Sequence, residues 1–79
     1  METHRMQDNN LTRMGNQIAT FFDSMPDRQE ATLDLATHLK KFWEPRMRRA
    51  FLQEIDAGHV AAIHPLLVSA VKLHRALIE

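Results

Sequence analysis

Cysteine is absent from this chain of 79 residues, and several kinds of chemistry are absent with it. Without cysteine there is no disulfide, no thiolate ligand for a metal ion and no cysteine nucleophile. A domain this short buries only roughly 60% of the surface that its unfolded chain exposes. Because no disulfide supports so small a core, we expect the support to come from oligomerisation or from a larger partner.

Glycine is scarce as well, with only Gly15 and Gly58. Two isolated glycines cannot form a Gly-rich phosphate loop, and the sequence has no nucleophile elbow. Ser24 and Ser69 are better explained as a helix cap and as part of a helix face. No combination of nucleophile, base and oxyanion donors can be read from the sequence. We therefore predict no catalytic residues and no cofactor-binding residues on this chain.

The five histidines do not form a metal-binding pattern. Helical metal sites usually place two ligands three or four residues apart, and no two histidines of this chain have that spacing. His59 and His64 are five residues apart, with no carboxylate between them. We predict no metal site.

Net charge and long apolar runs are also lacking. Ten Lys and Arg residues balance ten Asp and Glu residues, whereas a protein that binds nucleic acid alone usually carries a clear positive excess. The apolar tracts are too short to cross a bilayer. Residues 1–10 are polar with mixed charges, unlike a secretory signal or an Arg-rich transit peptide. We expect a cytoplasmic protein with neither nucleic acid nor membrane as its partner.

What the chain does contain is a basic segment, residues 40–49, with five cations and one acid. Phe42 and Trp43 lie between its two basic clusters, and residues 23–34 before it carry a local charge of −3. Arg and Trp dominate the energetic anchors of protein interfaces, although basic residues around aromatic rings are also typical of nucleic-acid surfaces. The separation of acidic from basic residues suits orientation on a partner.

Hydrophobic periodicity predicts four helices. The first follows Leu11, Met14, Ile18 and then Phe21 or Phe22, with a cap at one of residues 8–10 and an end at residues 23–26. We expect residues 1–8 to form a mobile tail and residues 9–79 to form a single helical domain. The second helix is predicted to have Ser24 as its N-cap and Pro26 with Asp27 in its first turn. Its apolar row is Ala31, Leu35, Leu39 and Phe42.

Two further prolines mark the remaining helices. Pro45 is expected in the first turn of a third helix, which has Met47, Phe51 and Ile55 on one face and Gly58 as its C-terminal cap. The fourth helix runs from Pro65 to about Ile78 with two apolar rows. These rows are Leu66, Ala70, Leu73 and Leu77, and Leu67, Val71, His74 and Ile78. No segment has the pattern of a strand, so the predicted fold is all-α, a small bundle of about four short helices.

Two stretches of the sequence resemble a known family. Residues 11–22 read Leu-Thr-Arg-Met-Gly-Asn-Gln-Ile-Ala-Thr-Phe-Phe, and residues 38–48 contain Phe-Trp-Glu-Pro-Arg-Met-Arg. Both resemble the delta subunit of bacterial NAD-dependent formate dehydrogenases. The resemblance implies a small non-catalytic subunit of a soluble complex that oxidises formate to carbon dioxide and reduces NAD. Such a subunit supports the assembly, stability or activity of the catalytic subunit.

The resemblance also implies where the cofactors lie. The catalytic (alpha) subunit holds molybdopterin guanine dinucleotide with molybdenum or tungsten. The partner subunits, which include electron-transfer subunits, also hold the iron–sulfur clusters and flavin that pass electrons to NAD. None of these cofactors is expected on this chain. The partner-binding residues are predicted in the basic segment and are Phe42, Trp43, Pro45, Arg46, Met47 and Arg48.

Two other functions stay open at the level of the sequence. One is a helical nucleic-acid-binding protein that uses the cations of the basic segment on phosphates. The other is a homodimeric regulator that covers its last helix with a second copy, so self-association of the isolated chain remains open.

Overall fold

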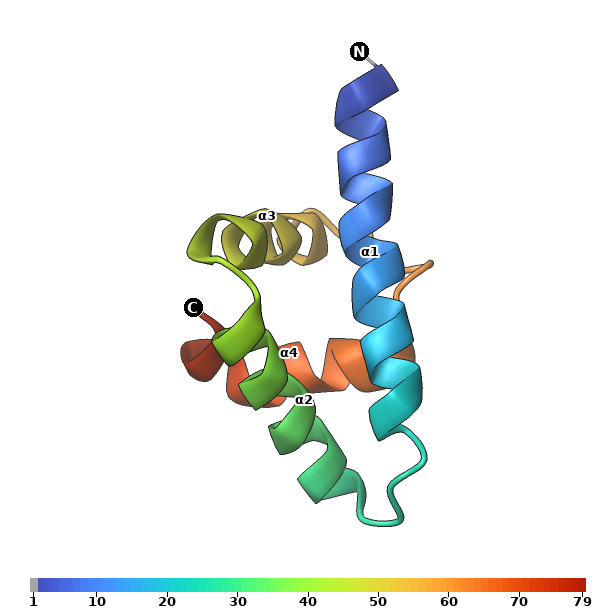
Figure 1. Ribbon diagram of the computed structural model, residues 1–79, viewed down its shortest axis with the longest axis vertical. Helices are drawn as coiled ribbons and strands as arrows, with labels where there is room; N and C mark the ends of the chain where they lie inside the picture. Colours follow the sequence, from blue (N-terminus) through green and yellow to red (C-terminus); the bar gives the residue numbers. More distant parts are fainter. Residues whose placement is uncertain (1) are drawn as a thin grey trace.

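A computed structural model describes the backbone of residues 2–79 and the side chains of residues 10–79. Its four helices are α1 (Glu2–Phe22), α2 (Arg28–Phe42), α3 (Pro45–Asp56) and α4 (Pro65–Ile78), and the described chain contains no strand. The predicted all-α fold is confirmed. In Figure 1, α1 follows the long axis of the molecule and its first turns extend beyond the other helices.

The start of α1 differs from its predicted position. The helix begins at Glu2 and not at residues 8–10, because residues 2–10 contain neither Gly nor Pro and so include no helix breaker. Its end at Phe22 agrees with the sequence pattern. The mobility of residues 1–8 and the domain boundary at residue 9 remain predictions.

The N-cap of α2 is Asp27, so the assignment of Ser24 was wrong. One carboxylate oxygen of Asp27 accepts hydrogen bonds from the backbone N–H groups of Gln29 and Glu30 at 3.0 and 3.2 Å. Ser24 instead donates its hydroxyl hydrogen to the carbonyl of Phe21 at 2.8 Å. Ser24 therefore serves the end of α1, and the next helix takes the acidic cap that its positive N-terminus favours.

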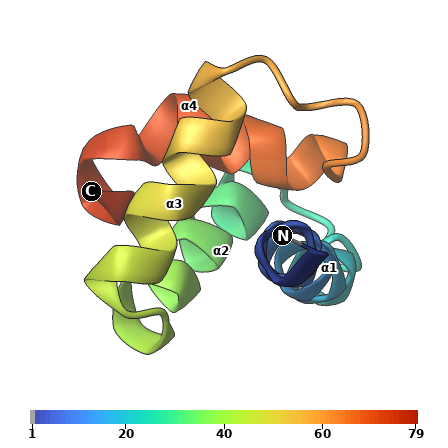
Figure 2. The same ribbon diagram turned by 90° about the horizontal axis from the view of Figure 1, so that it is seen from above.

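The core lies mainly between α2 and α4, which share the largest helix contact. Its fully buried side chains include Leu35, Leu39, Leu66 and Leu67, together with Phe51 from α3. Figure 2, which looks down α1, shows this helix standing at one side of the other three. A Cβ atom at Gly15 would lie 2.7 Å from Cδ2 of Leu67, so the missing side chain lets α1 approach α4 closely.

The ends of α3 and α4 follow the sequence signals. Pro45 is the first residue of α3, and Gly58 follows that helix with a φ of 87°, which a residue with a Cβ rarely adopts. Helix α4 spans Pro65–Ile78 as predicted. Its apolar rows are only partly buried, because Leu73 is exposed and the backbone at His74 leaves the helical region, with φ −128° and ψ 35°.

No helix of the described chain is long and apolar enough to cross a membrane.

Candidate functional site

Phe42 and Trp43 are neighbours in the sequence but lie in opposite environments. The Trp43 side chain is only 5% exposed, and its ring meets that of Phe51 edge to face, with centroids 5.7 Å apart. Phe42 is 69% exposed. The buried row of α2 is therefore Ala31, Leu35, Leu39 and Trp43, at a regular spacing of four residues. The assignment of Phe42 to this row was wrong, and Trp43, which was predicted to bind a partner, lies in the core.

The backbone explains how Trp43 reaches the core. Trp43 is the C-cap of α2, and its N–H still donates to the carbonyl of Leu39, so its side chain continues the buried row. Glu44 then adopts an extended conformation before Pro45, as a residue before proline must, and α3 begins in a new direction.

The Arg48 side chain is also buried. It is 6% exposed, and its Nη1 donates a hydrogen bond of 2.9 Å to the carbonyl of Ile78 at the end of α4. Its buried Nε has no partner among the described residues. Arg48 therefore binds a helix C-terminus, where a cation is favourable.

The six predicted partner-binding residues therefore divide into two groups. Phe42, Pro45 and Arg46 are exposed, whereas Trp43 and Arg48 are buried and Met47 is half-buried against the core. The buried residues Trp43 and Arg48, with half-buried Met47, hold the break between α2 and α3 in place and so position the three exposed side chains.

Around Phe42 the structure assembles a surface that sequence reasoning missed. We call it the aromatic row, and it consists of Phe21, Phe22, His38 and Phe42. Successive ring centroids are 5.2, 5.8 and 4.6 Å apart, and Phe21 and Phe42 at the two ends are 71% and 69% exposed. The short turn between α1 and α2 brings these rings together. The available signal was the i,i+4 spacing of His38 and Phe42 in the helix that follows the Phe21–Phe22 pair.

A shallow groove of about 240 Å³ lies along the aromatic row. Asp34 lines it toward the start of α2 and Lys41 lines it toward the end. The apolar surface is thus bordered by one negative and one positive side chain of the same helix.

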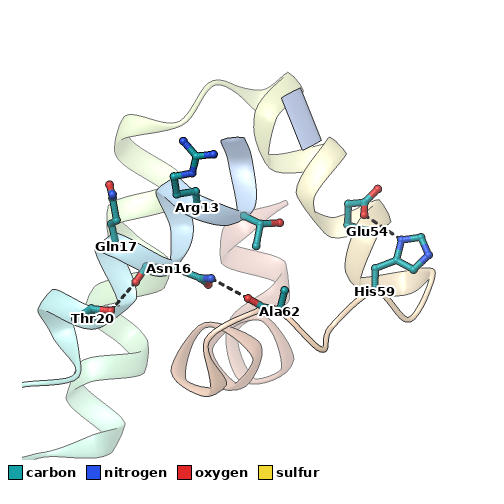
Figure 3. A pocket seen from close by; sticks show the side chains of 8 residues that line it. Arg13, Asn16, Gln17, Thr20, Glu54, His59 and Ala62 are labelled. Atoms are coloured by element: carbon teal, nitrogen blue, oxygen red, sulfur yellow. Dashed lines mark hydrogen bonds and ion pairs between the residues drawn. The ribbon is translucent and has the colours of Figure 1, made fainter. Parts of the chain in front are cut away.

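A second, polar groove of about 550 Å³ separates α1 from the connection between α3 and α4 (Figure 3). Asn16 of α1 lines the groove and makes two hydrogen bonds to the connection. Its Nδ2 donates to the carbonyl of Ala62 and its Oδ1 accepts from the N–H of His64, both at 2.8 Å. On the other wall, Nδ1 of His59 lies 3.0 Å from a carboxylate oxygen of Glu54. The two hydrogen bonds of Asn16 hold the connection against α1, and the His59–Glu54 contact ties it to α3.

Among the side chains of residues 10–79, no serine or threonine hydroxyl bonds a histidine ring. No group of three His, Asp or Glu residues in this part of the chain could hold a metal ion. Besides the polar groove and the aromatic row, the described residues form a hollow of about 350 Å³ beside Arg75 and one of about 320 Å³ beside Leu73.

The ends of α3 and α4 are joined by a charged clasp. Arg75 donates from Nη1 and Nη2 to the two carboxylate oxygens of Asp56 at 2.9 and 2.8 Å, and from Nε to Glu79 at 2.8 Å. The hydrogen bonds from Arg75 lower the pKa of Asp56, and those to Asp56 and Glu79 raise the pKa of Arg75. Both groups are therefore charged at neutral pH.

The fold and its surfaces define a small all-α domain whose two exposed phenylalanine rings belong to one row. The chain belongs to the family of the NADH-dependent formate dehydrogenase delta subunit, FdsD, whose family model matches residues 10–71. The resemblance found in the sequence is confirmed. Comparison with curated proteins and with solved structures gave no match. The matched residues include the whole aromatic row and every residue lining the polar groove.

Proposed function

We propose that this chain is a non-catalytic delta subunit that supports the assembly, stability or activity of the catalytic subunit of an NAD-dependent formate dehydrogenase. The match to the delta-subunit family over residues 10–71 carries the proposal. The small core and the exposed aromatic rings support it, because both favour a protein that works bound to something larger.

The proposal assigns all redox cofactors to other subunits. Molybdopterin guanine dinucleotide would lie in the catalytic subunit, and iron–sulfur clusters, flavin and the NAD site would lie in that subunit and the electron-transfer subunits. The absence of cysteine from this chain is consistent with that division, because thiolates are the usual cluster ligands. We place the complex in the cytoplasm.

We further propose that the contact with the catalytic subunit uses Phe42, Pro45 and Arg46. These three are exposed and lie within a stretch of five residues, at the break between α2 and α3. An exposed aromatic ring and an exposed arginine in one short segment suit an anchor that is desolvated on binding. Trp43, Met47 and Arg48 then serve to hold the break in shape. A phosphate-binding surface is less well supported, because Arg48 is buried.

The direct test compares the complex made with and without this chain. Without it, we expect a lower yield of the complex or lower formate-dependent NAD reduction per catalytic subunit. Phe42→Ala and Arg46→Ala should each weaken co-purification of the chain with the catalytic subunit. Leu73→Ala and Lys72→Ala are matched controls, because they remove an exposed apolar side chain and an exposed cation from α4. If the complex forms and works equally well without the chain, the proposed function is wrong.

A further inference from the structure

The charges beside the aromatic row are self-complementary. Asp34 and Lys41 are seven residues apart on one face of α2, a separation of roughly 10 Å along the helix at 1.5 Å per residue. Neither forms an ion pair with another side chain of residues 10–79. A second α2 laid antiparallel against the first would bring each Asp34 to the other copy's Lys41.

An antiparallel arrangement of this kind has two-fold symmetry. In an isologous dimer, residue i of one copy contacts residue j of the other and the reverse contact follows automatically. The midpoint between Asp34 and Lys41 falls at Thr37 and His38, which both line the groove. The two-fold axis would therefore pass beside the aromatic row, and the exposed Phe42 rings of both copies would be covered.

Two other properties favour a second copy as the occupant. The groove of about 240 Å³ is smaller than the roughly 300 to 1,000 Å³ of typical small-molecule sites, so it fits a side chain better than a ligand. The chain also carries no net charge, so two copies do not repel one another as a whole.

We propose that the free chain forms an isologous dimer through the aromatic row, with α2 packed antiparallel on α2 and Asp34 of each copy paired with Lys41 of the other. This inference goes beyond the proposed function, since it concerns the chain on its own. The two proposed surfaces share Phe42. Asp34 and Lys41 serve only the dimer, whereas Arg46 serves only the contact with the catalytic subunit.

Sedimentation equilibrium of the full chain over a range of concentrations tests the dimer. The wild-type protein should shift with concentration from the 9.2 kDa monomer to twice that mass. Phe42→Ala should weaken the dimer at least tenfold, as expected for an aromatic anchor that becomes covered in both copies. Leu73→Ala on α4 should leave the dimer unchanged. Circular dichroism verifies that each variant is folded.

Charge reversal gives the sharper test, because it predicts recovery as well as loss. Asp34→Lys alone and Lys41→Asp alone should each be monomeric, since each variant sets like charges against one another twice. The double variant with both changes should dimerise again, and a mixture of the two single variants should form mixed dimers. Lys72→Asp is the control for a reversed charge elsewhere.

Three outcomes would overturn the proposal. The wild-type chain could stay monomeric at every concentration. Both single charge variants could still dimerise, which would place the interface on another face. The monomeric wild-type chain could instead bind the formate dehydrogenase subunits in a manner that depends on Asp34 and Lys41, which would make another subunit the occupant. If Arg46→Ala no longer joins the complex but still dimerises, the result supports the proposed contact with the catalytic subunit. It also shows that the dimer does not depend on that contact.

Discussion

Phe42 and Trp43 show how two adjacent aromatic side chains take different roles at the end of one helix. Trp43 continues the buried row of α2 and closes the core against Phe51 and α1, whereas Phe42 ends the aromatic row on the surface. Their separation follows from helix geometry, because one residue turns the side-chain direction by 100°. Burial gives Trp43 a role in stability, and exposure leaves Phe42 available for binding.

Substitution of these two residues should separate stability from binding. Trp43→Ala should cost about 3 to 5 kcal/mol, as large aromatic truncations in a core do, which approaches the whole stability of a small domain. Phe42→Ala should change the free energy of unfolding by about 0.5 kcal/mol or less, because its ring is mostly in water. Urea denaturation followed by circular dichroism measures both. Equal stability of Trp43→Ala and the wild type would contradict the placement of the indole in the core.

Arg48 is an unusual residue for a core position, because no carboxylate pairs with it among the described residues. Its stem packs in the interior while one guanidinium nitrogen satisfies the carbonyl of Ile78. We predict that Arg48→Ala lowers stability by about 1.5 to 3 kcal/mol, the range for a hydrogen bond to a charged group, with a further loss from the stem. Arg48→Met should recover the packing part. Equal losses in the two variants, measured by urea denaturation, would mean that the stem contributes nothing.

At the scale of the elements, the turn between α1 and α2 holds both halves of the aromatic row in place. Ser24 in this turn bonds back to the end of α1, and Asp27 caps the start of α2. Asp27→Ala should destabilise the protein by about 1 kcal/mol, the usual cost of losing an N-cap. Ser24→Ala should cost less, since its bond lies at the exposed end of a helix. Thermal melts compare the two, and the reverse order would restore Ser24 as the cap.

The clasp between α3 and α4 should give stability a definite pH dependence. The pKa of Asp56 in the folded protein lies below its ordinary value of 3.8, so the folded state favours the carboxylate. The contribution of the clasp is fully present above pH 3.8 and is lost as the pH falls through the lowered pKa. Asp56→Asn should therefore melt at a lower temperature than the wild type at pH 7, and the difference should shrink below that range. A difference that persists unchanged in strong acid would assign it to some other effect.

Local signals in the sequence account for most element boundaries, while contacts between distant segments account for what was missed. Pro45, Gly58 and Pro65 fix the ends of α3 and α4 through the backbone angles that these residues allow. The burial of Arg48 depends on where α4 ends, thirty residues further along the chain. No periodicity within α3 contains that information.

The aromatic row also depends on contacts between distant segments, which local sequence signals do not contain. Phe42 was predicted as a contact residue from its place in the basic segment, and its exposure is compatible with that role. Phe21, Phe22 and His38 join it only because the turn at residues 23–27 folds α2 back along α1. The family match covers these residues within residues 10–71 but carries no information on their packing.

At the scale of the whole molecule, Phe42 belongs to two proposed interfaces that cannot be occupied at once. The free chain would cover Phe42 in its own dimer, and the bound chain would cover it against the catalytic subunit. Binding to the complex then requires the dimer to dissociate first. The apparent Kd for the catalytic subunit then equals the Kd of the monomer divided by the fraction of the chain that is monomeric.

This competition gives a prediction for Asp34→Lys, which should be monomeric but keeps Phe42 and Arg46. At concentrations where the wild-type chain is mostly dimeric, the variant should bind formate dehydrogenase prepared without this subunit more tightly than the wild type does. At low concentration the two should bind equally, because both are then monomers. Titrations monitored by sedimentation velocity, with one copy of the chain expected in each complex, measure the effect. Two copies in each complex, or equal binding at all concentrations, would show that the dimer surface and the docking surface do not overlap.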